Sequence, residues 1–173
     1  WIGSNVAILN GARIGEKCKI FPGAVVSAIP QDLKYKGEET TLELGRECIV
    51  RECCTLNRGT INPDYHADGR TTIGDGCLLM AYVHVAHDCH IAHGSILANN
   101  ATLAGHIEIG EYARLGGRNA YHNYTTALAA LYCYWLYTLP RYSTRAPVVL
   151  VTMRAGVAAM TSCYLGPFSV VST

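Results

Sequence analysis

A period of six residues is the feature of this sequence that most constrains its fold. Aliphatic residues recur at this spacing in two long runs, joined by a shorter one at Leu44, Val50 and Leu56. The runs are Ile2, Ile8, Ile14, Ile20 and Val26, and Ile73, Leu79, Val85, Ile91, Leu97, Leu103, Ile109 and Leu115. This period fits neither an α-helix nor an alternating strand, but it fits a three-sided coil in which each hexad supplies one short strand and one turn. The sequence therefore predicts an all-β fold, a parallel β-helix with 18 residues per coil.

The first residue of each hexad is expected to point into the coil, and the fifth to share that narrow interior. Five of the eight cysteines stand at fifth positions, namely Cys18, Cys48, Cys54, Cys77 and Cys89. Because free cysteine is compact and commonly buried, we interpret these five as core residues rather than ligands, nucleophiles or disulfide partners. Glycines at second positions, such as Gly74 and Gly110, are interpreted as turn residues that need relaxed backbone geometry.

Two polar segments, 27–43 and 57–72, interrupt the period and predict loops projecting from a β-helix of residues 1–120. Loops on a rigid scaffold often carry function. The net charge of +1 and the lack of a basic run argue against nucleic acid as a partner. The apolar stretch 127–139 is too short to cross a bilayer, so no transmembrane segment is expected.

Four histidines, His84, His87, His90 and His93, follow one another at intervals of three. Such spacing suggests a metal site. However, they alternate between the sixth and third hexad positions, so they should leave the coil at different faces and corners. We therefore expect no metal site.

The coil length selects one histidine from this group. Gly105 follows His87 by 18 residues, and His106 follows Asp88 by 18 residues, so each pair should stack at about the 4.8 Å spacing of neighbouring strands. An imidazole, an adjacent carboxylate and an unhindered glycine N–H would then share one edge. A general base beside an N–H donor suits acyl transfer to a hydroxyl, because the donor stabilises the tetrahedral oxyanion.

Several motifs carry a family resemblance. The segments QDLKYKGE (31–38), NRGT (57–60), LLMAYVHVAHDC (78–89) and ILANNATLAGH (96–106) resemble the UDP-N-acetylglucosamine O-acyltransferases that open lipid A biosynthesis in Gram-negative bacteria. The resemblance implies a left-handed β-helix, a homotrimer and a cytoplasmic enzyme. Such an enzyme moves a 3-hydroxyacyl chain from acyl carrier protein to the 3-hydroxyl of UDP-N-acetylglucosamine, without a metal or other cofactor.

The resemblance also implies roles for individual residues. His87 would be the general base with Asp88 beside it, and Gly105 would supply the oxyanion N–H. Three pairs of residues are implied in substrate binding. Asp32 and Lys34 would contact the sugar nucleotide, and His84 and His106 would line the site at a subunit boundary. His122 and Asn123 would lie near the nucleotide, where Asn replaces the family's Gln. Residues 121–173 are expected to continue the β-helix, with the family's helical C-terminal domain absent.

Three alternatives stay open. The N-acyltransferase that acts later in the same pathway shares the fold and a histidine-centred mechanism. A β-helical zinc carbonic anhydrase typically carries two histidines five residues apart, and no two histidines here have that spacing. A catalytically silent β-helical scaffold is the third.

Overall fold

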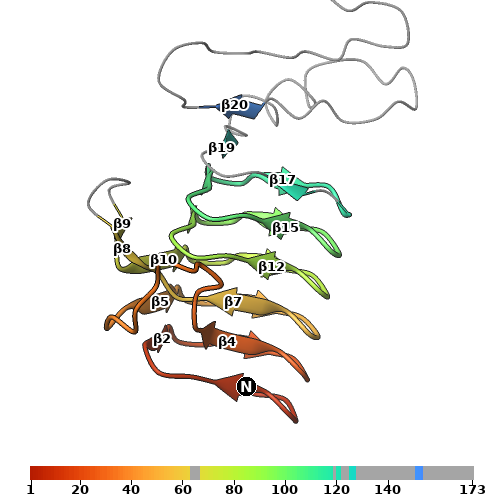
Figure 1. The fold of residues 1–173 in the computed structure, drawn as a ribbon. Helices are drawn as coiled ribbons and strands as arrows, with labels where there is room; N and C mark the ends of the chain where they lie inside the picture. Colours follow the sequence, from red (N-terminus) through yellow and green to blue (C-terminus); the bar gives the residue numbers. More distant parts are fainter. Residues whose placement is uncertain (63–66, 119, 122–124, 128–150, 154–173) are drawn as a thin grey trace, which may run out of the picture.

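The described part of the chain is a stack of coils whose three sides are parallel β-sheets (Figure 1). The computed structural model describes residues 1–62, 67–118, 120–121, 125–127 and 151–153. Every regular element in these residues is a β-strand. The fold is the expected left-handed parallel β-helix.

Each side of the coil takes one strand from each turn. The first side consists of β1 (Ala7–Ile8), β4 (Val25–Ala28), β7 (Thr55–Asn57), β12 (His84–Val85), β15 (Thr102–Leu103) and β18 (Ala120–Tyr121). The second consists of β2 (Ala12–Ile14), β5 (Thr41–Leu44), β10 (Arg70–Ile73), β13 (His90–Ile91), β16 (Glu108–Ile109) and β19 (Thr125–Ala127), and β20 (Val151–Met153) joins its sheet as an antiparallel strand. The third consists of β3 (Lys19–Ile20), β6 (Ile49–Val50), β11 (Leu78–Leu79), β14 (Ile96–Leu97) and β17 (Arg114–Leu115).

The register confirms the 18-residue coil wherever no loop intervenes. His84 pairs with Thr102, for example, and Leu78 pairs with Ile96. Two coils are longer, because one loop joins β4 to β5 and a second segment joins β7 to β10. This second segment is more regular than a loop, since β8 (Ile61–Asn62) and β9 (Ala67–Asp68) form an antiparallel pair that projects from the stack (Figure 1).

The interior follows the hexad pattern. From Ile20 onward the aliphatic residues at first positions are buried, and the five cysteines at fifth positions are at most 6% exposed. These thiols are free, and burial raises the pKa of Cys54 to about 11 and that of Cys89 to about 12. Cys54 and Cys89 are therefore protonated at neutral pH, and all five cysteines pack in the core, as predicted.

The interpretation of the second-position glycines is wrong. Left-handed backbone instead falls on the fourth position of the hexads, as at Asp88 and His106. Second-position glycines are required by close packing between coils. A Cβ on Gly45 would lie 2.6 Å from the backbone nitrogen of Asp75, and one on Gly74 would lie 2.6 Å from the backbone nitrogen of His93.

Beyond residue 118 the description is partial. β18 and β19 keep the parallel register of the coil, whereas β20 pairs antiparallel with β19. Residues 122–124, 128–150 and 154–173 lie outside the described residues, so continuation of the β-helix there stays a prediction. The described residues contain no helix long and apolar enough to span a membrane.

Candidate functional site

The candidate site lies at the corner where the first side of the coil turns into the second. Residues 86–89, between β12 and β13, stack under residues 104–107, between β15 and β16. The same corner releases both insertions, because one leaves β4 for β5 and the other leaves β7 for β10. The fold thus brings both loops to the edge that carries His87.

His87 and Asp88 form a hydrogen-bonded pair at this corner. Their Nδ1 and Oδ2 atoms are 2.8 Å apart, and their side chains are 13% and 3% exposed. Burial raises the pKa of Asp88, but hydrogen bonds from His87 and Thr60 outweigh it and hold the pKa below its usual value. The ionised carboxylate only accepts hydrogen bonds, so His87 Nδ1 donates, and in the neutral form of the ring this tautomer leaves a lone pair on Nε2.

Gly105 lies directly against the imidazole, as the 18-residue offset predicts. A Cβ at this position would be 2.6 Å from Cε1 of His87, so only glycine fits without displacing the ring. The N–H of the next residue, His106, donates to the His87 carbonyl oxygen at 3.1 Å. Within the part of the chain that the structure describes, no protein group accepts the Gly105 N–H, which leaves it available to an oxyanion.

His106 completes the cluster from the coil above. Its ring packs edge-on against that of His87 with centroids 5.1 Å apart, and its Nε2 lies 3.8 Å from Asp88 Oδ2. Burial lowers the pKa of His106 and outweighs the opposing effect of Asp88. This imidazole is therefore predominantly neutral at pH 7.

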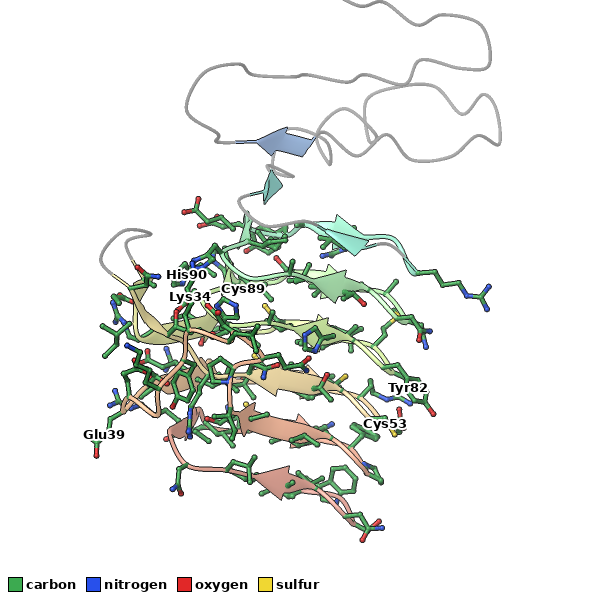
Figure 2. All side chains as sticks on the ribbon, in the orientation of Figure 1. Lys34, Glu39, Cys53, Tyr82, Cys89 and His90 are labelled. Atoms are coloured by element: carbon green, nitrogen blue, oxygen red, sulfur yellow. The ribbon has the colours of Figure 1, made fainter. Side chains whose placement is uncertain are left out.

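The loop between β4 and β5 carries Asp32 and Lys34. The Lys34 N–H donates to Asp32 Oδ1 at 2.9 Å, which closes a tight turn around the aspartate. Burial lowers the pKa of His106, and the Asp32 carboxylate is among the charges that oppose this effect. In Figure 2, Lys34 lies at the edge of the stack where Cys89 and His90 are labelled, and Cys53 and Tyr82 lie at the opposite edge.

Among the described residues, no hydrogen bond joins the remaining predicted residues to the His87–Asp88 pair. His84, on β12, has its Nδ1 2.8 Å from Thr55 Oγ1; burial lowers its pKa, and the charge of His87 adds to that effect. His122 and Asn123 lie outside the described residues. His90 instead contacts Thr72 on the second side of the coil.

Sequence reasoning missed two threonines that bind Asp88. Thr60 donates to both carboxylate oxygens, from its N–H at 2.7 Å and from its hydroxyl at 2.5 Å. The hydroxyl of Thr71 accepts the Asp88 N–H at 2.8 Å. Thr60 stands in the motif NRGT, 28 residues before Asp88. The projecting segment between β7 and β10 lengthens this coil, so an offset of 18 residues does not predict that Thr60 and Asp88 meet.

The cluster also has a donor set that suits a metal ion. One ligand atom from each of His87, Asp88 and His106 lies within 4.8 Å of the others. The Asp88 carboxylate already accepts hydrogen bonds from Thr60 and His87, so a cation here would displace the imidazole N–H. These residues therefore fit a hydrogen-bonded dyad better than a metal site.

Comparisons with known proteins agree with the hexapeptide pattern. Residues 70–105 match the family described as bacterial transferase hexapeptide (six repeats). The acyl-[acyl-carrier-protein]–UDP-N-acetylglucosamine O-acyltransferase of Campylobacter concisus is 47% identical over 130 residues, which cover 71% of this chain and 48% of that protein. The chain spans about half the length of the curated relatives it matches.

Solved structures show the same likeness. A crystal structure of UDP-N-acetylglucosamine acyltransferase matches with a TM-score of 0.67 and 49% identity, over 70% of this chain and 46% of that one. LpxA from Acinetobacter baumannii matches with a TM-score of 0.64 and 41% identity, over 71% of this chain and 48% of that one. The repeat, the fold and these likenesses together show that the chain carries the hexapeptide repeat of bacterial transferases and is similar to UDP-N-acetylglucosamine O-acyltransferases over about half of their length.

Proposed function

We propose that this chain carries the catalytic edge of a UDP-N-acetylglucosamine O-acyltransferase, which performs the first step of lipid A biosynthesis. The observation that carries the proposal is the contact of His87 with Asp88 Oδ2 at 2.8 Å, with Gly105 packed against the same imidazole. The names of the relatives support the acyl donor, acyl carrier protein, and the acceptor, UDP-N-acetylglucosamine.

The reaction follows from this arrangement. His87 Nε2 takes the proton of the sugar 3-hydroxyl as its oxygen attacks the thioester carbonyl of the 3-hydroxyacyl donor. The Gly105 N–H donates to the resulting oxyanion, and Asp88 stabilises the imidazolium. The intermediate then collapses, the C–S bond breaks, and the carrier thiolate leaves with the proton from His87. No covalent enzyme intermediate and no metal takes part.

The substrate sites belong to the same proposal. Asp32 and Lys34 contact the sugar nucleotide from their loop, while His84 and His106 line the site, and His122 with Asn123 lies near the nucleotide. The enzyme acts as a cytoplasmic homotrimer, in which the edge that carries His87 faces a neighbouring subunit.

The direct test is an acyl-transfer assay. The protein is incubated with UDP-N-acetylglucosamine and a panel of 3-hydroxyacyl carrier proteins, and the ester product is measured by mass spectrometry. His87→Ala removes the base, so we expect it to lower kcat by at least about 100-fold while sedimentation still gives a trimer. Near-normal turnover by this variant would contradict the role of His87.

The same preparation separates the alternatives. Transfer only to a free amine of an acylated sugar nucleotide would identify the N-acyltransferase. Stoichiometric zinc together with CO₂ hydration would identify the carbonic anhydrase, whose ligands would include the cluster at His87.

A further inference from the structure

Thr60 joins the segment that follows β7 to the buried Asp88 carboxylate. It is 5% exposed, and its N–H and hydroxyl donate to the two different oxygens of Asp88, at 2.7 and 2.5 Å. Such two-point contact with an ionised group is stronger and more directional than a single neutral hydrogen bond. Thr60 therefore constrains the rotation of the carboxylate and, together with His87, favours its ionised form.

The backbone around Thr60 is itself held firmly. The Gly59 N–H donates to the Thr41 carbonyl oxygen at 3.1 Å, and the Gly69 N–H donates to the Thr60 carbonyl oxygen at 2.8 Å. A Cβ on Gly59 would overlap the backbone nitrogen of Arg70, so the chain packs tightly against β10 at this point. The Thr60 donors thus have little freedom to follow a moving carboxylate.

The contact extends to the imidazole through one atom. Asp88 Oδ2 accepts from the Thr60 hydroxyl and also lies 2.8 Å from His87 Nδ1. His106 is the other titratable group near this oxygen among the described residues, at 3.8 Å. A carboxylate rotated by Thr60 presents Oδ2 to Nδ1, which favours the tautomer that leaves Nε2 unprotonated.

We propose that Thr60 is a positioning residue whose hydroxyl, acting through Asp88, holds His87 in the orientation and tautomer of a general base. Its importance for catalysis rests on the proposed function, whereas its effect on the imidazole does not. A purely structural role would affect the stability of the corner without altering the tautomer of His87.

The test compares two substitutions in the full chain. Thr60→Val keeps the shape and the N–H but removes the hydroxyl, whereas Thr60→Ser keeps both donors. Loss of one hydrogen bond to a charged group predicts a kcat about 10- to 100-fold lower for Thr60→Val, with KM for UDP-N-acetylglucosamine little changed. Thr60→Ser is expected to stay within about threefold of the unaltered enzyme, because its hydroxyl restores the contact.

A second readout does not depend on turnover. Long-range ¹H–¹⁵N spectra of histidine-labelled protein report the tautomer of His87, whose signal is identified by its loss in His87→Gln. We expect the Nδ1–H form in the unaltered protein and in Thr60→Ser, and a mixture of tautomers in Thr60→Val. If Thr60→Val does not fold, Thr60→Ala provides the same comparison.

Thr72→Val is the matched control, because it removes a hydroxyl that lies 2.9 Å from Nδ1 of His90, outside the cluster. It should leave kcat and the His87 signal unchanged. An unchanged His87 tautomer in Thr60→Val would overturn the proposal, as would equal losses of kcat in Thr60→Ser and Thr60→Val. A tautomer change in a protein without transferase activity would instead support the positioning role and contradict the proposed function.

Discussion

Asp88 and His106 both occupy the fourth hexad position, where the coil imposes left-handed backbone. Their φ angles are 57° and 61°, and the same position holds residues as different as Lys17 and Tyr82 at 60° and 62°. Left-handed backbone costs a non-glycine residue about 1–2 kcal/mol, but Asp tolerates it better than most residues. The scaffold accepts this cost at many turns, so the site occupies a regular corner rather than a special distortion.

The contact between Gly105 and His87 makes a prediction at the scale of one residue. Gly105→Ala adds a Cβ that would lie 2.6 Å from the imidazole, so the ring must move away from its proposed catalytic position. Misplacement by about 1 Å predicts a kcat about 100-fold lower, measured in the acyl-transfer assay.

The control for this substitution lies at another corner. A Cβ at Gly76 would meet no atom within 4 Å, and Asn occupies the equivalent hexad position at Asn100. Gly76→Asn should therefore retain full activity. Equal turnover by Gly105→Ala and Gly76→Asn would contradict the assigned role of Gly105.

At the scale of the elements, β7 ends in residues that fasten the loop bearing Asp32 and Lys34. Asn57 donates from Nδ2 to the Ile29 carbonyl oxygen at 2.5 Å. The Arg58 guanidinium donates to the Asn10 carbonyl oxygen at 2.8 Å and to the Tyr35 hydroxyl at 3.1 Å. The segment that positions Asp88 through Thr60 therefore also holds the proposed sugar-nucleotide loop.

This arrangement predicts that Arg58 affects substrate binding more than chemistry. Arg58→Met removes both donors, so the loop should sample other positions and KM for UDP-N-acetylglucosamine should rise about tenfold, with kcat little changed. Arg58→Lys keeps the charge but not the planar fork, so an intermediate KM is expected. Initial-rate kinetics measure both constants.

Arg13→Met is the matched control, because Arg13 pairs with Glu43 on an exposed face and has a side chain that is 69% exposed. It should leave KM unchanged. A loss of kcat without a rise in KM in Arg58→Met would show that the loop has a different role.

For the whole molecule, buried ionisable groups predict how stability depends on pH. Burial lowers the pKa of His84 and His106, so the unfolded chain binds more protons than the fold once the pH falls below about 6.5. Stability from these neutral imidazoles is present above that pH and is lost as the pH falls through their folded pKa values. The lowered pKa of Asp88 adds a second loss at more acidic pH, below about 4.

Thermal unfolding measured from pH 8 to pH 4 checks this prediction. The melting temperature should decrease once the pH drops below about 6.5. This decrease should be smaller in a variant that combines His84→Gln with His106→Gln, because glutamine takes up no proton. An identical pH profile in that variant would show that other groups cause the loss.

The repeat by itself determined the coil, its core and the stacking of His87 with Gly105. A fixed 18-residue offset turns sequence separation into spatial contact wherever coils follow one another without interruption. The likeness of its motifs to a known family added the proposed substrates and the left-handed winding, neither of which the spacing alone supplies.

Only the tertiary structure decided which groups orient the dyad and hold the loop. Thr60 reaches Asp88 across 28 residues, and Arg58 reaches Asn10 across 48, because the two insertions break the regular offset between coils. Their partners depend on how each insertion folds back on the corner, which is a matter of packing and hydrogen bonding between segments far apart in the chain. The period of six therefore locates the proposed catalytic edge, and contacts across the insertions determine its geometry.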